Sequence, residues 1–158
     1  MMIKQNRVYL AGPFFSDQQT KRLDDLQDLL KQNRTIGDIF RPASEDYTAA
    51  EIGTFEWQTA VFKHDINNIN VSDVVVAMLD YKLEDNEPEP DSGTVWECGY
   101  AFAHNIPVIA VREQADLPLN LMLAGSLTAF FNGKDNIKKI KDYDFNSLMT
   151  RYEDVKVF

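Results

Sequence analysis

The sequence predicts a doubly wound α/β fold, in which a mainly parallel five-stranded sheet carries helices on both faces. Short apolar runs alternate along the chain with longer segments whose apolar residues recur at helical spacing. The run at residues 74–79 is β-branched and apolar on both faces, as expected for a central strand of a parallel sheet. With 158 residues, 44% of them apolar, the chain fits a single domain spanning residues 1–158.

The first half of the chain predicts two strands, each followed by a helix. The first strand ends at Gly12-Pro13, and Ser16 or Asp17 is placed to cap the helix that follows. Leucines recur within that helix at the spacing of one buried face. The predicted elements are a strand at 8–11, a helix at 18–31, a short strand at 39–40, a polar loop at 43–54 and a helix at 55–69.

The second half continues the alternation of strands and helices. Its predicted elements are a strand at 74–79, an acidic, proline-containing loop at 82–90, a helix over 94–103, a strand at 107–111, an apolar segment from 119 to 123, a strand at 127–131 and a short polar helix at 135–141. This order is typical of flavodoxin-like and Rossmann-like folds, which bind ligands at the carboxyl ends of the strands.

Charge and cysteine content narrow the range of partners. The formal net charge of -9 argues against a nucleic-acid polymer or an anionic membrane, because both require a basic surface. Small neutral or weakly charged ligands are more compatible with this negative charge than either of those partners. The single cysteine, Cys98, has no intrachain partner for a disulfide, and residues 1–7 lack the apolar stretch of a signal peptide. We therefore expect a reducing, cytoplasmic location.

One glutamate stands out because it lies in an otherwise apolar helix. Within residues 94–103 the neighbours of Glu97 are apolar, aromatic or glycine, apart from Thr94. A buried carboxylate in this setting is either paired, with Arg112, Arg7 or a backbone donor, or is used in chemistry. Its place near the start of a helix favours the ionised form, because the helix dipole is positive there, and an ionised carboxylate is what an oxygen nucleophile requires.

Two further acids are weaker candidates. Asp91 precedes the same helix, where the simplest interpretation is an N-cap. Asp65 lies on the predicted helix at 55–69, where a lone acid is more often a solvated surface residue. Sequence spacing alone does not bring Asp65 to Glu97.

No pattern predicts a metal or a cofactor. His64, His104 and Cys98 do not have the spacing of metal ligands, and Gly12-Pro13 does not match the glycine-rich sequences that bind dinucleotides or triphosphates. We expect neither a metal nor a cofactor, so the carboxylates are the candidate catalytic groups.

Several segments, taken in order, resemble the nucleoside 2-deoxyribosyltransferase family. The resemblance spans nearly the whole chain, and its specificity comes from the compatible spacing of pieces that are weak individually. The segments are Val8-Tyr9-Leu10-Ala11-Gly12-Pro13-Phe14-Phe15, His64-Asp65-Ile66-Asn67-Asn68-Ile69, Asp91-Ser92-Gly93 with Glu97-Cys98-Gly99-Tyr100-Ala101, Leu119-Asn120-Leu121-Met122, and Asp142-Tyr143-Asp144-Phe145-Asn146.

The resemblance implies a role for each matching residue within one subunit. Glu97 matches the family's nucleophile, and Tyr9 the tyrosine whose hydroxyl orients it. Asp91 matches the acid that holds a sugar hydroxyl. Asp65 matches the acid that faces the nucleobase and is linked to its protonation. The segment at 8–15 adds Gly12 and Phe14 to the expected substrate site.

The resemblance also implies an oligomer with shared sites. Asn120, followed by Met122, matches an asparagine that binds the sugar in a neighbouring subunit's site, and the expected assembly is a hexamer built as a trimer of dimers. Family members place their C-terminal residue, often tyrosine, near the base. This chain ends in Phe158, which keeps the terminal carboxylate and lacks the hydroxyl.

The activity implied is transfer of 2-deoxyribose between purine or pyrimidine bases, through a covalent deoxyribosyl-glutamate and with retention. The expected ligands are deoxynucleosides and free nucleobases, with no cofactor. One rival is a nucleoside 5′-monophosphate N-glycosidase, which must bind a phosphate that Asp91 would repel. A second rival is a non-catalytic nucleoside sensor on the same fold.

Overall fold

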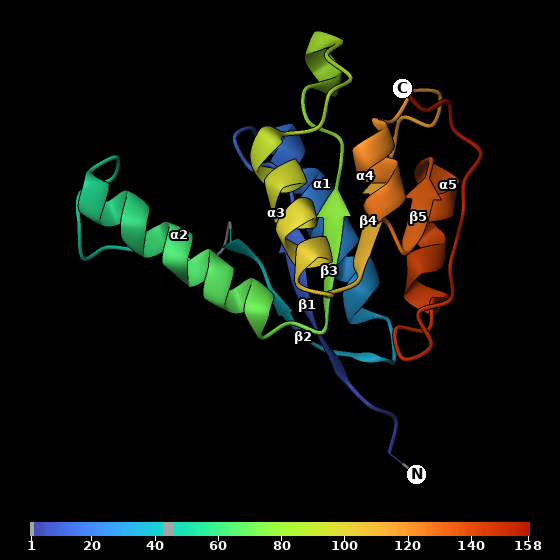
Figure 1. The fold of residues 1–158 in the computed structure, drawn as a ribbon, viewed down its shortest axis with the longest axis horizontal. Coiled ribbons are helices and arrows are strands. Elements are labelled where there is room, and N and C mark those ends of the chain that lie inside the picture. The colour runs from blue at the N-terminus through green and yellow to red at the C-terminus, as the bar shows by residue number, and fades with distance from the viewer. Residues whose placement is uncertain (1, 43–45) are drawn as a thin grey trace.

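A computed structural model describes residues 2–42 and 46–158 and shows an open parallel sheet (Figure 1). The strand order is β2-β1-β3-β4-β5, and every neighbouring pair is parallel. This order confirms the predicted doubly wound fold of the flavodoxin type. The strands are β1 (Asn6–Ala11), β2 (Ile36–Phe40), β3 (Val74–Met78), β4 (Val108–Arg112) and β5 (Ala129–Asn132).

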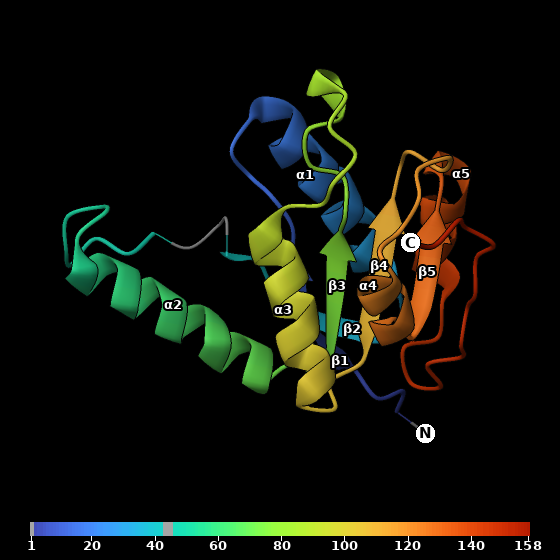
Figure 2. The same cartoon turned by 45° about the horizontal axis from the view of Figure 1, so that its top comes forward.

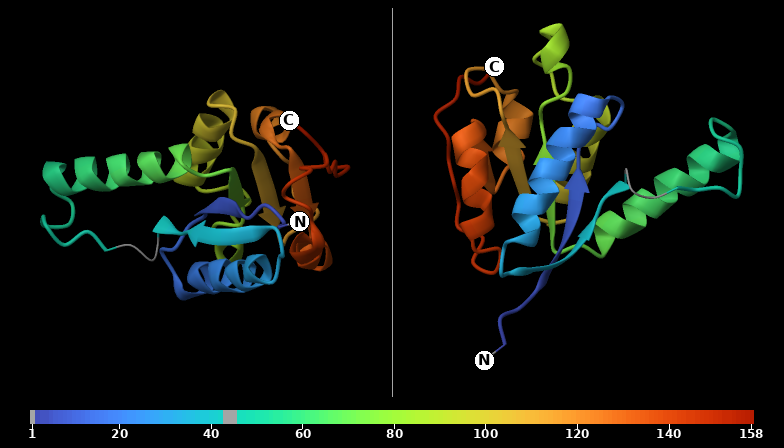
Figure 3. Two further views of the ribbon diagram at one scale, coloured as in Figure 1. Left: turned by 90° about the horizontal axis from the view of Figure 1, so that it is seen from below. Right: turned by 180° about the vertical axis from the view of Figure 1, so that it is seen from behind.

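Helices cover both faces of the sheet, as predicted. Viewed from below, α1 and α5 lie on one side of the strands, and α3 and α4 on the other (Figure 3). The helices are α1 (Asp17–Lys31), α2 (Phe55–Asn70), α3 (Ser92–Ala103), α4 (Leu121–Ser126) and α5 (Lys134–Ile137), with short 3-10 turns η2 (Leu83–Asp85) and η3 (Lys138–Asp142).

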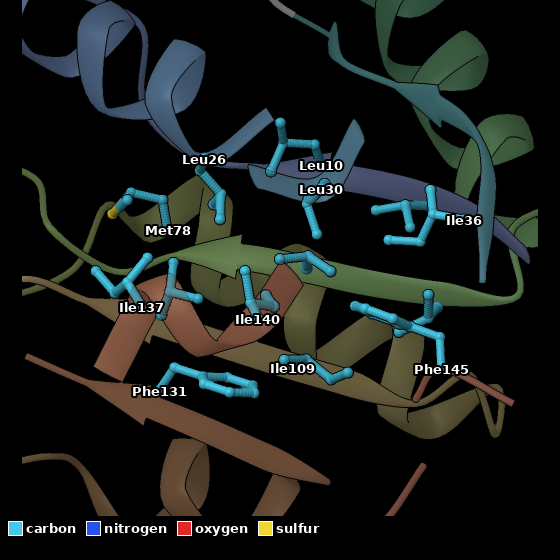
Figure 4. Packing of buried hydrophobic residues seen from close by; sticks show 14 of the residues in the cluster. Leu10, Leu26, Leu30, Ile36, Met78, Ile109, Phe131, Ile137, Ile140 and Phe145 are labelled. Carbon is cyan, nitrogen blue, oxygen red and sulfur yellow. The ribbon is translucent and has the colours of Figure 1, made fainter. Parts of the chain in front are cut away.

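The core consists of two apolar layers because the side chains of each strand alternate between the two faces. In β3, Val74, Val76 and Met78 pack toward α1 and α5, whereas Val75 and Ala77 pack toward α3 and α4. The first layer is filled by leucines of α1, by Ile137 and by residues of the neighbouring strands (Figure 4). Burial on both faces explains why this strand reads as a continuous apolar run.

Three polar side chains define where the longer helices begin. Ser16 caps α1 by accepting the Gln19 N–H, and Thr54 caps α2 by accepting the Trp57 N–H. Asp91 caps α3 in the same way. Each side chain satisfies a backbone donor that has no partner within its helix.

The structure differs from the sequence predictions mainly at element boundaries. The short strand predicted at 39–40 extends back to Ile36, because β2 lies at the sheet edge and tolerates exposed polar residues. The predicted helix at 135–141 divides into α5 and η3. Residues 46–54 form a loop as predicted, and residues 43–45 of that prediction lie outside the described residues.

Helix α2 projects away from the sheet (Figures 1 and 2). Ile69, near its C-terminal end, is its one buried residue, while Phe55 and Phe62 are 81% and 53% exposed. The helix is therefore anchored at one end and presents apolar side chains along its length. Across residues 2–42 and 46–158, no helix has the length and apolarity needed to cross a membrane.

Candidate active site

The centre of the candidate site is a short hydrogen bond between a tyrosine and a glutamate. The Tyr9 hydroxyl donates to Oε1 of Glu97 across 2.5 Å. Tyr9 is fully buried in the interior strand β1, and Glu97 lies in the second turn of α3, which packs on the same face of the sheet. The strand thus provides a rigid support for a carboxylate on the neighbouring helix.

The arginines proposed from the sequence as partners of Glu97 are engaged elsewhere. Arg112 donates to Oδ1 of Asn132 and to the carbonyl oxygens of Leu117 and Pro118. Arg7 forms an ion pair with Asp38 and donates to Asn68. The hydrogen-bond partner of Glu97 is therefore a neutral hydroxyl, and its carboxylate is not neutralised by either arginine.

Burial dominates the titration of this pair. It raises the pKa of Glu97 to about 7; the Tyr9 hydrogen bond opposes this rise, and the negative charges of Asp65 and Asp91 add to it. The desolvation cost thus outweighs the stabilisation expected from the helix dipole. Burial, and then the charge of Glu97, also raise the pKa of Tyr9 well above its usual value, so Tyr9 stays protonated as the donor.

Asp65 comes to the same cavity as Glu97, although the two residues lie on different helices. A cavity of about 290 Å³ between α2 and α3 is lined by both acids, together with Phe62, Ile66, Ile69, Gly93 and Trp96. Asp65 also lines a neighbouring cavity of about 350 Å³, whose wall includes Tyr47 and His64. It is therefore partly buried between two cavities, and the interpretation of Asp65 as a solvated surface acid is wrong.

Asp91 fixes the start of the helix that carries Glu97. Its Oδ2 accepts the backbone N–H of Thr94 at 2.9 Å and the Thr94 hydroxyl at 3.2 Å. The N-cap interpretation is confirmed. The same carboxylate raises the pKa of Glu97 through its charge, so it lies near enough to act on the site electrostatically.

Gly12 and Phe14 lie in the loop at the carboxyl end of β1. A Cβ atom on Gly12 would lie 2.6 Å from Cδ2 of Leu23 and 3.1 Å from Cβ of Met78, so glycine permits α1 to approach the strand end closely. Phe14 is 43% exposed and stacks on Phe15 with ring centroids 5.2 Å apart. These aromatic rings are available to a ligand at this edge.

The remaining predicted site residues lie on the other side of α3. Asn120 and Met122 at the start of α4, and Phe158 at the chain end, line an apolar cavity of about 770 Å³. Its wall from α3 is made by Val95, Gly99 and Phe102, not by Glu97. Within one chain, the structure therefore does not bring these three residues into the Glu97 cavity.

Sequence reasoning misses two aromatic residues of the site. The Phe40 ring lies between those of Tyr9 and His64, with centroid distances of 5.4 and 5.5 Å. Phe62 forms a wall of the Glu97 cavity and contacts Trp96. The available signal for Phe40 was its position as the last residue of a strand, where open α/β sheets bind ligands.

The described residues contain no group of three or more His, Cys, Asp or Glu side chains arranged to hold a metal ion. Cys98, next to Glu97, is buried and is not in a disulfide. The groups gathered around Glu97 are thus a hydroxyl, carboxylates and aromatic rings, a set suited to nucleophilic and acid–base chemistry.

Comparison with known proteins identifies the family. The family model described as nucleoside 2-deoxyribosyltransferase matches residues 8–136, which include Tyr9, Asp65, Asp91 and Glu97. The chain belongs to this family. It is therefore an enzyme of the glycosyltransferase class, and more narrowly a pentosyltransferase.

Individual relatives agree with this assignment. A nucleoside deoxyribosyltransferase of Limosilactobacillus fermentum is 28% identical, and the match covers 99% of this chain and 96% of the relative. A solved 2-deoxyribosyltransferase structure from Bacillus psychrosaccharolyticus is 29% identical, with a TM-score of 0.78, over 93% of this chain and 98% of the other.

A more distant structure shares the fold. A CMP N-glycosidase of Clostridium botulinum has a TM-score of 0.55 at 18% identity, over 87% of this chain and 99% of that one. At this identity the likeness concerns the fold alone.

Proposed function

We propose that the enzyme moves 2-deoxyribose from one nucleobase to another through an ester of Glu97, with net retention at C1′. The observation that carries this proposal is the Tyr9–Glu97 hydrogen bond on the wall of a cavity that Asp65 also lines. The arrangement supplies an oriented nucleophile and a second acid in one small volume. Two displacements at C1′, each with inversion, give retention.

Glu97 has the properties of a carboxylate nucleophile. A pKa near 7 makes the carboxylate more basic than an ordinary glutamate, while a large fraction is still ionised at neutral pH. Tyr9 engages Oε1, so Oε2 is the oxygen that attacks C1′. The buried hydroxyl fixes the carboxylate orientation before substrate arrives, which lowers the entropic cost of reaching the transition state.

Asp65 is proposed to handle the proton of the base. In the first step the C1′–N bond breaks, the C1′–O bond to Glu97 forms, and the Asp65 proton passes to the departing nitrogen. In the second step a nitrogen of the incoming base attacks C1′, the ester bond breaks, and the proton of that base returns to Asp65. In retaining glycosidases two such carboxyl groups lie about 5 Å apart.

The sugar and base are proposed to be held by the residues around this pair. Asp91 is assigned to a sugar hydroxyl, because its carboxylate lies at the start of the helix that carries Glu97. Phe14, in the loop with Gly12, provides an exposed ring at the carboxyl end of β1 for contact with the base. Deoxynucleosides and free nucleobases are the proposed substrates, and the reaction requires no cofactor.

A neighbouring subunit is proposed to complete the site. Asn120, Met122 and Phe158 lie outside the Glu97 cavity of their own chain, and Met122 is 80% exposed. The exposed apolar residues of α2 support contact with another copy of the chain. In a hexamer built as a trimer of dimers, Asn120 binds the sugar across the interface, and the added residues exclude water from the ester so that transfer exceeds hydrolysis.

An exchange assay tests the proposal directly. The purified enzyme is incubated with deoxyinosine or thymidine as donor and with adenine or cytosine as acceptor, and new deoxynucleosides are separated by chromatography. Glu97→Ala is expected to abolish exchange, whereas Glu56→Ala, an exposed glutamate in the first turn of α2, keeps it. Mass spectrometry of the wild type with donor alone is expected to detect one added deoxyribosyl group on Glu97.

The same experiment separates the rival activities. Release of free base from deoxynucleoside 5′-monophosphates, without exchange between deoxynucleosides, would support an N-glycosidase in place of a transferase. Binding of deoxynucleosides without free base, exchange or an adduct would support a sensor. Retained exchange in folded Glu97→Ala protein would reject Glu97 as the nucleophile.

A further inference from the structure

The last residues of the chain form one isolated parallel bridge, Val157 with Leu119, beside the segment that contains Asn120, and residues 156–158 are called the terminal strand below. The N–H of Leu119 donates to the Lys156 carbonyl at 2.9 Å, and the N–H of Phe158 donates to the Leu119 carbonyl at 3.2 Å. The N–H of Leu121 donates to the terminal oxygen of Phe158 at 2.8 Å. Both residues that flank Asn120 are therefore held by the chain end through backbone hydrogen bonds.

The tail is also attached to the sheet further back, at Arg151. Arg151 pairs with Ala129 in a parallel bridge, its carbonyl accepts the Phe130 N–H, and its guanidinium lies 4.8 Å from the centroid of the Phe131 ring. Val155 packs against the core layer on the α3 side. These contacts lead the tail along the edge of β5 to α4, where the chain end lies in Figure 2.

The tail residues that reach α4 contribute little to the core. The side chains of Lys156, Val157 and Phe158 are all exposed, and backbone hydrogen bonds connect Lys156 and Phe158 to residues 119–121. Leu119, by contrast, is buried. The tail therefore holds residues 119–121 through their backbone, while the buried side chain of Leu119 holds them through packing.

The orientation of Asn120 depends on this segment. Its Oδ1 accepts the Met122 N–H at 2.9 Å, which leaves the amide NH2 group to donate outward. α4 has only six residues, too few to hold its first turn rigid by helical hydrogen bonds alone. The hydrogen bond from the Leu121 N–H to the chain end satisfies another donor of that first turn.

We infer that residues 156–158 are a positioning strand that holds the Asn120–Met122 turn in the conformation that binds the sugar. The strand acts through its backbone, and its side chains and its terminal charge are secondary. This inference rests on the proposed function, because it takes Asn120 as a sugar-binding residue. It makes the end of the chain a determinant of substrate affinity and not of the chemical step.

A matched pair of substitutions isolates the backbone contribution. Phe158→Ala and Phe158→Pro both remove the ring, but only proline also removes the N–H that donates to Leu119. The KM for the donor deoxynucleoside is expected to be roughly threefold higher in Phe158→Pro than in Phe158→Ala. Equal KM values in the two variants would overturn the inference.

Deletion and extension of the chain end test the strand and the charge separately. Deletion of residues 156–158 is expected to raise KM about tenfold with a smaller change in kcat, because three hydrogen bonds are lost. Adding Gly-Ser after Phe158 moves the charge away while a peptide carbonyl still accepts from Leu121, so KM is expected to change less than in the deletion. Tyr152→Ala, exposed in the same tail, is the control.

A double variant distinguishes positioning from general stability. If the strand acts through Asn120, the deletion is expected to add almost nothing to the KM of Asn120→Ala. If the deletion and Asn120→Ala each raise KM and their factors multiply in the double variant, the inference is overturned. A deletion that changes kcat and leaves KM unchanged would also overturn it.

Amide hydrogen exchange gives a readout that does not depend on activity. The Leu119 and Leu121 amides are expected to exchange at least tenfold faster in the deletion variant, while amides of β1 and β3 keep their rates. Faster exchange with an unchanged KM would overturn the inference and leave the proposed function standing. A wild-type protein without base exchange would instead overturn the proposed function, and the inference with it.

Discussion

The hydroxyl of Tyr9 and the carboxylate of Glu97 join the interior strand β1 to the second turn of α3 through a hydrogen bond of 2.5 Å. The donor is fixed by the sheet and the acceptor by the helix, so neither needs to reorganise when substrate binds. The bond also keeps the pKa of Glu97 lower than burial alone would set it. Orientation and ionisation of the candidate nucleophile therefore depend on the same contact.

The pH dependence of the reaction follows from the Glu97 pKa of about 7. In the proposed mechanism Glu97 attacks C1′ as the carboxylate, so kcat/KM is expected to rise tenfold per pH unit well below pH 7 and to stop rising near pH 7. The measurement is the initial rate of base exchange between pH 5 and pH 9 at low donor concentration. A rate that is flat from pH 5 upward would contradict this expectation.

Tyr9→Phe is expected to shift this profile. Loss of the hydrogen bond removes the one interaction with a neighbour that lowers the pKa of Glu97, so the rising limb moves to higher pH. At pH 6.5 we expect a drop in kcat/KM of about tenfold or more, with a smaller loss at pH 9. Tyr100→Phe, whose hydroxyl donates to Asn70, is the matched control. Superimposable profiles for Tyr9→Phe and wild type would exclude this role of the hydroxyl.

Glu97→Gln is expected to stabilise the folded protein at alkaline pH. The ordinary pKa of a glutamate side chain is 4.5, whereas that of Glu97 in the fold is about 7, so the folded state holds the proton more tightly than the unfolded chain. Folding stability is therefore lost as pH rises from about 4.5 to about 7, and the loss persists above that range. A neutral amide avoids this loss, which is about 3 kcal/mol at pH 8 for a shift of this size.

Thermal unfolding at two pH values checks the effect of Glu97→Gln. At pH 8 the Tm of the variant is expected to exceed that of wild type by roughly 6–12 °C. At pH 4 the difference should disappear, because wild-type Glu97 is then mostly protonated in both states. An equal Tm difference at both pH values would show that packing, and not ionisation, separates the two proteins.

A second buried acid has a structural role. Asp80 follows β3 and accepts the backbone N–H groups of Glu113 and Gln114, at 2.6 and 3.4 Å, beyond the end of β4. Asp80→Ala leaves these donors without a partner and is expected to cost about 2–3 kcal/mol in urea unfolding. Asp80→Asn retains one oxygen acceptor and should cost less. Equal costs for the two variants would argue against the hydrogen bonds as the source.

Subunit mixing tests whether sites are shared. Glu97→Ala protein is expected to have no exchange activity, and Asn120→Ala protein is expected to have little at donor concentrations well below its raised KM. Mixed oligomers contain some sites with both an intact Glu97 and an intact Asn120 from another chain, so activity should reappear after subunits exchange. Mass spectrometry of differently labelled chains verifies the mixing. Absence of recovery in verified heteromers would place Asn120 outside the neighbour's site.

Local patterns were sufficient to predict the sheet but not its boundaries. The residues at 74–79 predict β3 because burial on both faces requires an apolar side chain at every position. β2 was predicted too short because Gly37 and Asp38 interrupt the apolar pattern, and exposure at the sheet edge permits them. The boundaries of the short helices depend on capping contacts that periodicity does not encode.

The candidate site depends on contacts between distant parts of the chain. Periodicity predicts a helix around Glu97, yet its contact with Tyr9 arises only from the order in which the strands assemble. The family resemblance supplied Tyr9 and Asp65 as candidates, whereas composition and spacing did not. Phe62 was missed because an aromatic residue at helical spacing looks the same whether it packs in a core or lines a cavity.

The anchoring of α2 has a consequence for how the enzyme responds to dilution. Asp65 is carried by α2, whose one buried residue is Ile69, so a small swing of that helix would change the separation between Asp65, the proposed proton donor, and Glu97. In the proposed oligomer, a second chain lying against α2 sets this separation. Turnover per molecule should therefore fall at low protein concentration while circular dichroism still records an intact fold.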